Sequence, residues 1–201
     1  MIKAIFLDRD GVLNVFKLGT YVNKPEDLEV FPFAGPAISI FNDLGYTVFV
    51  ITNQSGIAKG HFGLATLCDI HRKLTGTIQE SGGDIKRFYT CIHNPGDKMC
   101  KCRKPKPGMI LEAAATYDID LSKSYMVGDA GSDIEAGVNA GCRTVAVLSG
   151  QLSEEHEWLS LPVRPEFMFT DVYRFAINLK NEEISNGMGH ARAEEEWPPT
   201  L

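Results

Sequence analysis

The 201-residue sequence predicts a doubly wound α/β fold built on a parallel sheet. Short apolar runs alternate along the chain with segments of helical periodicity. The runs are continuous rather than alternating, as expected for strands covered by helices on both faces. Polar clusters follow several runs directly, where open α/β sheets bind their ligands. The clearest predicted strands are 4–7, 47–51, 88–92, 125–127 and 144–148.

Three segments between these strands predict helices. Residues 64–80 carry apolar side chains and one histidine on a single stripe at helical spacing. Residues 107–117 begin with a proline, which suits the first turn of a helix, and continue into an alanine-rich run. Ser132 and Glu135 predict a capping box for a third helix that ends near Gly141.

Two loops interrupt the alternation of strands and helices within the predicted domain. Residues 14–36 are rich in glycine and proline, and residues 91–108 combine prolines with clustered cysteines. We expect one domain over 1–180, in which these segments form a substrate loop and a zinc loop. Residues 181–201 contain five Glu and one Arg and predict an acidic, flexible tail.

Composition excludes several function classes. Hydrophobic residues make up 44% and charged residues 23% of the chain, which is typical of a soluble domain. A net charge of −6 argues against nucleic-acid or anionic-membrane binding. We find no secretory leader and no apolar run near the ~20 residues of a membrane span. Three of the five cysteines lie within 91–102, which indicates a metal site in a reducing compartment, so we expect a cytoplasmic protein.

Carboxylates follow two of the predicted strands. Asp8 and Asp10 come directly after the first strand, and Asp129 follows the fourth. Three acids that converge would repel one another unless a cation lies between them, and oxygen ligands favour Mg²⁺. The alternative is that the D-R-D-G segment is an ordinary turn after a strand.

Cations and hydroxyl groups are predicted at the same edge. Thr52 and Ser55 follow the second strand, and Arg103 and Lys104 follow the cysteine loop. Phosphoryl transfer requires such groups to neutralise and orient the phosphate oxygens. A solvated basic face is the alternative for most of the five basic residues in this loop, which are Lys98, Lys101, Arg103, Lys104 and Lys106.

Four segments resemble, in order, the motifs of the haloacid dehalogenase superfamily of phosphatases. They read F-L-D-R-D-G-V-L-N, V-I-T-N-Q-S-G-I-A, C-R-K-P-K-P-G-M and M-V-G-D-A-G-S-D-I. More narrowly, the chain is similar to the D-glycero-D-manno-heptose 1,7-bisphosphate phosphatases and the related histidinol-phosphate phosphatases. The resemblance covers about residues 1–150.

This resemblance implies the catalytic roles. Asp8 would be the nucleophile that forms an aspartyl-phosphate, and Asp10 would act first as acid and then as base, which a carboxylate pair can do. Anionic neighbours would favour a protonated Asp10, and the metal would oppose it. Thr52 and Lys104 would hold the phosphoryl group.

The resemblance also implies a ligand set for Mg²⁺. Asp8, the backbone carbonyl of Asp10 and Asp129 would bind the ion, with Asp133 as a supporting carboxylate.

The cysteine loop predicts a closed, structural zinc site. Three thiols and one imidazole in close-set pairs match the ligand inventory of such sites. The predicted ligands are Cys91, His93, Cys100 and Cys102. The site would position the two basic residues that follow it. Cys68 and Cys142 lie outside the cluster, and we expect both to be buried core residues.

Substrate choice is the least determined feature. The segment 19–22 resembles the G-Y-V segment of the heptose enzymes, which favours removal of the C7 phosphate of D-glycero-D-manno-heptose 1,7-bisphosphate. The short metal loop instead resembles that of the histidinol-phosphate enzymes, so histidinol phosphate is an alternative substrate. Another small sugar phosphate is a further alternative. Ala130 follows Asp129 at a position where many heptose enzymes have a basic or polar residue. The expected substrate contacts are Tyr21, Asn53, Gln54, Ser55, Arg103 and Ala130.

Two other classes remain as alternatives. A phosphotransferase or mutase would need a cap that excludes water, and the sequence offers no segment for one. A non-catalytic, zinc-stabilised interaction module is the remote alternative. We expect a monomer whose partner is a small phosphorylated sugar.

Overall fold

The computed structural model describes residues 1–193 and contains one sheet of six parallel strands. The strand order is β3-β2-β1-β4-β5-β6. Successive strands are added on one side of β1 up to β3 and on its other side from β4 onward, so the order reverses between β1 and β4. This switch point is where open α/β sheets bind ligands. The predicted fold class is confirmed. The strands are β1 (Ala4–Leu7), β2 (Thr47–Asn53), β3 (Arg87–Cys91), β4 (Tyr125–Gly128), β5 (Arg143–Val147) and β6 (Phe167–Phe169).

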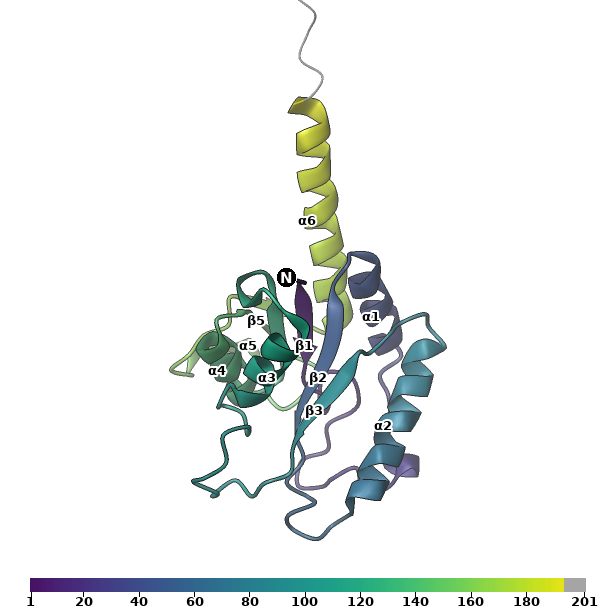
Figure 1. Ribbon diagram of the computed structural model, residues 1–201, viewed down its shortest axis with the longest axis vertical. Coiled ribbons are helices and arrows are strands. Elements are labelled where there is room, and N and C mark those ends of the chain that lie inside the picture. Colours follow the sequence, from purple (N-terminus) through teal and green to yellow (C-terminus); the bar gives the residue numbers. More distant parts are fainter. Residues whose placement is uncertain (194–201) are drawn as a thin grey trace, which may run out of the picture.

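Helices cover both faces of the sheet (Figure 1). Three of them, α1, α2 and α6, contribute to the core cluster on one face, and α3 lies in the cluster on the other. α4 packs against β4 and β5. The helices are α1 (Ala34–Asp43), α2 (Leu64–Gln79), α3 (Gly108–Tyr117), α4 (Gly131–Ala140), α5 (Glu155–Leu159) and α6 (Val172–Ala193).

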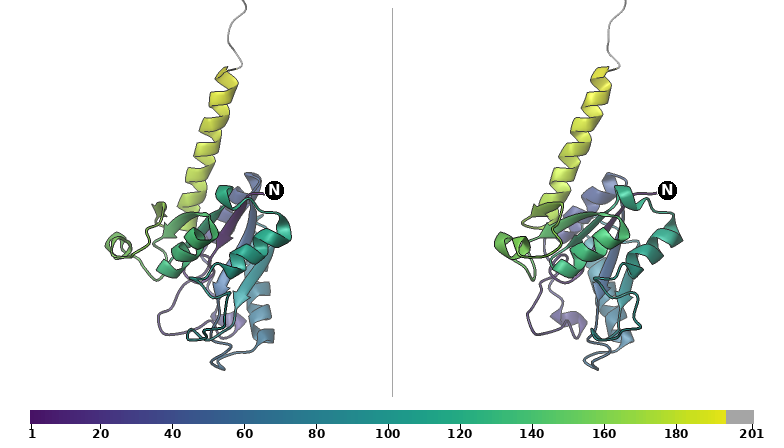
Figure 2. Two further views of the ribbon diagram at one scale, coloured as in Figure 1. Left: turned by 60° about the vertical axis from the view of Figure 1, so that its left-hand side comes forward. Right: turned by 90° about the vertical axis from the view of Figure 1, so that its left-hand side faces the viewer.

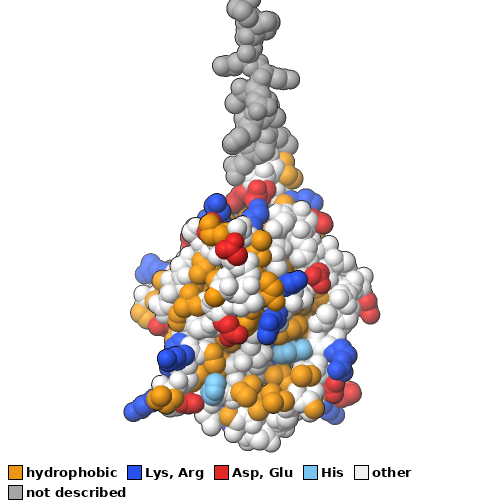
Figure 3. All heavy atoms as spheres, in the orientation of Figure 1, with side chains coloured by type: hydrophobic (Ala, Val, Ile, Leu, Met, Phe, Trp, Pro, Cys, Tyr) orange, Lys and Arg blue, Asp and Glu red, His pale blue; other side chains and the backbone are white. Residues whose placement is uncertain are grey.

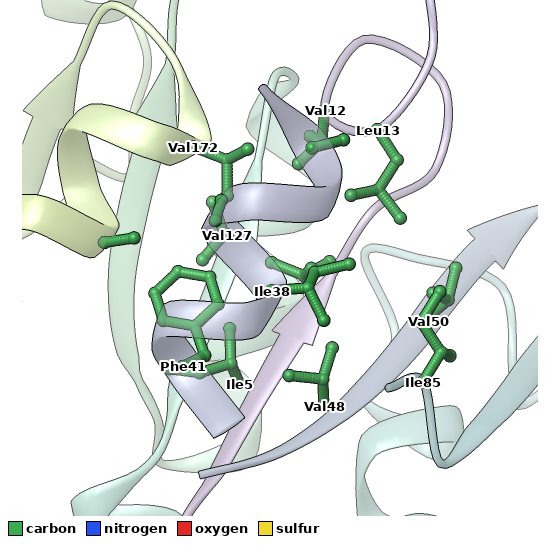
Figure 4. Close-up of a cluster of buried hydrophobic side chains, with 14 of the residues drawn as sticks. Ile5, Val12, Leu13, Ile38, Phe41, Val48, Val50, Ile85, Val127 and Val172 are labelled. Atoms are coloured by element: carbon green, nitrogen blue, oxygen red, sulfur yellow. The ribbon is translucent and has the colours of Figure 1, made fainter. Parts of the chain in front are cut away.

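Strand residues alternate between the two core clusters. Ile5 of β1 and Val48 of β2 face α1, where Ile38 and Phe41 pack against them, and all four are fully buried (Figure 4). The neighbouring Phe6 lies in the cluster on the other face. Because both faces are buried, the strands read as continuous apolar runs. The core therefore fixes the strand ends that carry the polar clusters.

The three predicted helices are present, but the cap of α4 differs from the prediction. The helix begins at Gly131, and Ala130 is the N-cap residue. The backbone N–H of Ala130 donates to Asp133 Oδ2 at 3.1 Å. The capping box predicted from Ser132 and Glu135 was wrong by two positions, because the carboxylate that closes the first turn is Asp133.

Several elements were not predicted. α1 begins at Ala34 inside the predicted loop 14–36, and no side chain caps its N-terminus. β6 is a three-residue strand at the edge of the sheet. α6 continues to Ala193 and rises beyond the sheet, so that 181–193 of the predicted flexible tail are helical (Figure 2). Residues 194–201 of that tail lie outside the described residues.

The two cysteines outside the cluster differ in their exposure. Cys142 is buried, whereas Cys68 is exposed on α2, so the core assignment was wrong for Cys68. Basic and acidic side chains are interspersed on the face shown in Figure 3. Within residues 1–193, no helix has both the length and the apolar character that a membrane crossing requires.

Candidate active site

A pocket of about 830 Å³ lies at the carboxyl ends of the strands. Its wall combines the ends of β1, β2 and β4 with the loop 14–36 and the segment after the cysteine cluster. This volume is in the range of small-molecule sites. The polar residues predicted after β1, β2, β4 and the cysteine loop all line the pocket, so the predicted convergence is observed.

Lys104 lies between two carboxylates at the base of the pocket. Its Nζ is 2.8 Å from Asp8 Oδ1 and 2.6 Å from Asp133 Oδ1, and its side chain is 2% exposed. Burial would lower the pKa of Lys104, but the two carboxylates outweigh it and raise the pKa. Burial raises the pKa of Asp8 to about 7, with a further contribution from Asp133 and an opposing one from Lys104. The amine is thus held fully charged.

Asp129 completes a cluster of three acids. Asp8, Asp129 and Asp133 each offer a carboxylate oxygen, and these oxygens lie within 4.8 Å of one another. Burial raises the pKa of Asp129, and the charges of Asp8 and Asp133 raise it further. One cation does not neutralise three carboxylates, so the cluster has the charge and the donor set for a divalent ion.

Two glycines make room for the Asp129 carboxylate. A Cβ atom on Gly11 would lie 2.1 Å from Asp129 Oδ2, and one on Gly150 would lie 2.0 Å from the same atom. Gly11 also has a φ of +86°, which disfavours any other residue. The Gln151 backbone N–H donates to Asp129 Oδ2 at 2.6 Å. The carboxylate is therefore fixed from several sides.

Asp10 is held in its ionised form. Arg9 donates from Nη2 to both carboxylate oxygens at 2.9 Å, and Asn14 and Gln54 each donate at 2.9 Å. Burial would raise the pKa of Asp10, but the Arg9 charge and these hydrogen bonds lower it below its usual value. Anionic neighbours were expected to favour a protonated Asp10, but the buried Arg9 and these hydrogen bonds shift its pKa in the other direction.

Gln54 connects Asp10 to the end of β2. Its Nε2 donates to Asp10 Oδ2 at 2.9 Å and to Thr52 Oγ1 at 2.8 Å. Thr52 is 1% exposed and Gln54 is 2% exposed. The amide of Gln54 thus contacts other site residues, whereas the sequence predicted a substrate contact.

Asn53 uses its side-chain amide on the backbone of Lys104. The Lys104 N–H donates to Asn53 Oδ1 at 3.2 Å, and Asn53 Nδ2 donates to the Lys104 carbonyl at 3.2 Å. The sequence predicted a substrate contact here also. Nothing in the sequence links positions 53 and 104, because the contact depends on the path of the cysteine loop.

Two further cations, Lys59 and Arg103, line the same pocket. Lys59 Nζ donates to Tyr21 Oη at 2.8 Å, and the ring of His61 stacks on Tyr21 at 5.0 Å between centroids. The hydrogen bond from Lys59 lowers the pKa of Tyr21, with a contribution from Ser55. Within residues 1–193, neither Lys59 nor Arg103 has a carboxylate partner.

Sequence reasoning missed Lys59 and His61 in this group. The available signal was their position in the loop that follows the S-G-I-A segment. Ala130, a predicted substrate contact, also lines the pocket.

The four predicted zinc ligands converge in a separate cluster. Zn–S bonds of about 2.3 Å and Zn–N bonds of about 2.0 Å set ligand separations of roughly 3.5–3.8 Å in a tetrahedron. The separations observed are 3.6 Å for Cys91–Cys100, 3.5 Å for Cys100–Cys102, 3.5 Å for Cys91–His93 and 3.4 Å for Cys102–His93. The cluster therefore has the dimensions of a tetrahedral metal site.

Comparisons with known proteins agree with this fold. The HAD-hydrolase-like family model matches residues 101–175. The D-glycero-beta-D-manno-heptose-1,7-bisphosphate 7-phosphatase of Pseudomonas putida is 41% identical over 149 residues, which cover 74% of this chain and 84% of that protein. The D-glycero-alpha-D-manno-heptose-1,7-bisphosphate 7-phosphatase of Photorhabdus laumondii is also 41% identical, over 164 residues that cover 77% and 87% of the two chains.

A solved structure supports the same assignment. The D,D-heptose 1,7-bisphosphate phosphatase from B. bronchiseptica, complexed with magnesium and phosphate, superposes with a TM-score of 0.83 at 36% identity, and the match covers 90% of this chain and 99% of that one. The chain has the fold of the haloacid dehalogenase-like hydrolases and is a phosphatase of that class. Within that class, the chain belongs to the D-glycero-D-manno-heptose-1,7-bisphosphate 7-phosphatase family.

Proposed function

We propose that this protein removes the C7 phosphate of D-glycero-D-manno-heptose 1,7-bisphosphate by way of an aspartyl-phosphate on Asp8. The observation that carries the proposal is the buried cluster of Asp8, Lys104, Asp129 and Asp133 at the switch point of the sheet. A carboxylate beside a fixed cation is a competent nucleophile toward phosphorus, because the cation offsets the charge of the phosphate oxygens.

In the first step, an Asp8 carboxylate oxygen attacks the phosphorus and the bond to the sugar oxygen breaks. The sugar oxygen takes a proton from Asp10. In the second step, Asp10 accepts a proton from water, whose oxygen attacks the phosphorus and releases phosphate and the Asp8 carboxylate. Lys104 and the Thr52 hydroxyl hold the phosphoryl oxygens in both steps.

The contacts of Asp10 suit the second of these steps. Arg9, Asn14 and Gln54 favour the ionised carboxylate, which is the form that accepts a proton from water. The first step requires a proton on Asp10. The second step returns that proton from water, so Asp10 ends each cycle in the protonated form with which the next first step begins.

The acidic cluster fits Mg²⁺. Asp8, Asp129 and the Asp10 backbone carbonyl would hold the ion, with Asp133 in support. The raised pKa values of Asp8 and Asp129 are those of carboxylates that a divalent cation would relieve. The ion would neutralise charge on the phosphoryl oxygens. The magnesium and phosphate in the B. bronchiseptica relative support this assignment.

We also propose a structural Zn²⁺ in the cluster of Cys91, His93, Cys100 and Cys102. The tetrahedral dimensions and the closed set of four protein ligands support it. Zinc held there would fix an irregular loop whose next residues are Arg103 and Lys104.

A bisphosphate substrate fits the charge distribution of the pocket. Lys104 lies at the acidic base, whereas Arg103 and Lys59 lie on the wall without carboxylate partners among residues 1–193. A second phosphate would be attracted to these two cations, with hydroxyl donors from Tyr21 and Ser55 beside it. Relatives are named for both the beta and the alpha anomer.

We propose that residues 1–180 form the catalytic domain of a cytoplasmic monomer. The clustered thiols support a reducing compartment. Size-exclusion chromatography with light scattering tests the monomer.

One panel of substrates tests the activity. Phosphate release is measured with Mg²⁺ from both anomers of heptose 1,7-bisphosphate, from fructose 1,6-bisphosphate and from histidinol phosphate. We expect the heptose bisphosphates to give the highest kcat/KM, and Asp8→Asn to abolish release. A preference for histidinol phosphate would overturn the substrate. Release unchanged in Asp8→Asn would overturn the mechanism, and no release from any substrate would favour the interaction module.

A further inference from the structure

We infer that Asn53 is a positioning residue that sets the place of Lys104, rather than a contact for the substrate. The inference rests on the proposed function only for the role of Lys104. Both polar atoms of the Asn53 side chain are engaged by the Lys104 backbone, one as acceptor and one as donor, each at 3.2 Å. An amide bound in this two-point manner is held in one orientation by the protein backbone.

The Lys104 backbone depends on this contact. Within residues 1–193, no backbone group bonds to the Lys104 N–H or carbonyl. Buried peptide groups without partners cost roughly 1–3 kcal/mol each. Lys104 is 3% exposed, so the Asn53 amide supplies what a neighbouring strand would otherwise supply. The side chain of Asn53 thus ties the loop after the cysteine cluster to the end of β2.

The location of Asn53 gives the contact its consequence. Asn53 pairs with Cys91 in the register of β2 and β3, and the Gln54 N–H donates to the Cys91 carbonyl at 2.7 Å. Thr52, the proposed phosphoryl ligand, directly precedes it. One strand end therefore carries the hydroxyl for the phosphoryl group and the amide that fixes Lys104, so both groups keep one relative placement.

The position of the Lys104 amine matters for catalysis. Its Nζ must stay within ion-pair distance of Asp8 and Asp133 while its backbone lies in an irregular loop. A positional error of about 1 Å in a catalytic group can lower turnover by about a hundredfold. Loss of the Asn53 contact should therefore affect kcat more than KM.

Asn42 is a matched control at the other end of the sheet. It accepts from the Asp84 N–H at 2.8 Å and donates to the Asp84 carbonyl at 3.3 Å, which is the same two-point contact with a backbone. Asn42 is half-buried, as is Asn53, and it does not line the site pocket. Asn53→Leu and Asn42→Leu each remove a two-point contact with a backbone, and only the first lies beside the site. Asn42→Leu also removes a hydrogen bond from Asn42 Nδ2 to the Tyr46 carbonyl at 3.3 Å, so the control loses at least as many contacts.

The decisive experiment is a double-mutant cycle measured in the full-length protein with both metals present. We expect Asn53→Leu to lower kcat at least tenfold with KM changed less than threefold, and Asn42→Leu to change kcat less than twofold. In the Lys104→Ala background, Asn53→Leu should lower the residual kcat less than twofold, because no amine remains to be placed. An equal loss in both backgrounds, or a loss mainly in KM, would overturn the inference.

An independent measurement does not require turnover. Hydrogen exchange of the Lys104 amide should speed up at least tenfold in Asn53→Leu, while that of Gln54, bonded to the Cys91 carbonyl, stays unchanged. Unchanged exchange at Lys104 would overturn the inference. If the wild type hydrolyses no substrate while exchange at Lys104 responds as expected, the proposed function fails and the positioning contact stands.

Discussion

Replacing Lys104 by methionine tests the electrostatics of the site most directly. The substitution keeps an unbranched side chain and removes the ammonium group between Asp8 and Asp133. The two carboxylates are 15% and 1% exposed, so water cannot take over the role of the amine. Loss of one member of a buried ion pair costs about 3–5 kcal/mol. We expect the free energy of unfolding to fall by about 3 kcal/mol at pH 8 in protein without Mg²⁺. This is the lower end of the range, because Asp8 is partly exposed.

The pH dependence of this loss has a definite sign. The pKa of Asp8 is already raised to about 7 with Lys104 present, and removal of Lys104 raises it further. A raised pKa in the folded state means that the folded protein takes up the proton and becomes less stable as pH rises through that value. The loss should therefore be smaller at pH 6 than at pH 8, since protonation of Asp8 removes one of the two facing charges.

Urea unfolding of wild type and Lys104→Met at pH 6 and pH 8, with zinc retained and Mg²⁺ omitted, measures both quantities. Lys123→Met is the control for loss of one positive charge, because the Lys123 side chain is 73% exposed and distant from the pocket. The control should stay within about 0.5 kcal/mol of wild type. A loss below about 1 kcal/mol at pH 8, or an equal loss at both pH values, would refute the electrostatic account.

Three further predictions use the same structure. Cys100→Ser should lower the unfolding midpoint and kcat together, since a structural zinc site can contribute ~10 kcal/mol; a zinc-free variant with full activity, measured beside metal analysis, would contradict it. Gly11→Ala should lower Mg²⁺-dependent activity at least tenfold, because its Cβ would lie 2.1 Å from Asp129 Oδ2; an unchanged Mg²⁺ affinity by calorimetry would argue against this. Mg²⁺ should bind more tightly at pH 8 than at pH 6 with proton release at neutral pH, because the pKa of Asp8 is about 7 before the ion binds; equal affinities would show that the site binds the ion without deprotonation.

The sequence predicted the parts of the site that depend on strand ends. Asp8 and Asp129 follow continuous apolar runs, and a parallel sheet brings the carboxyl ends of such runs to one edge. The role of Lys104 came from a motif resemblance, because a lysine in a basic loop has no signature of its own. Its 2% exposure depends on a fold that periodicity does not describe.

Other features could not be predicted because they depend on non-local contacts. α1 has no side-chain cap, so its start at Ala34 carries no sequence signal. The low pKa of Asp10 depends on the burial of Arg9, which the D-R-D-G segment does not indicate. The contact between Asn53 and Lys104 depends on the path of the cysteine loop. Lys59 has no distinguishing signal in the sequence, and only the fold brings it to Tyr21.

The origin of the site in three strand ends and the loop after the cysteine cluster links ligand binding to folding. Asp8, Thr52, Lys104 and Asp129 are far apart in an unfolded chain, so Mg²⁺ and substrate should bind only the folded protein. A ligand at one hundred times its Kd then stabilises the folded state by about 2.7 kcal/mol. The shift of the thermal denaturation midpoint therefore ranks candidate sugar phosphates by affinity, and it can do so with the Asp8→Asn protein, in which the ligand is not consumed during heating.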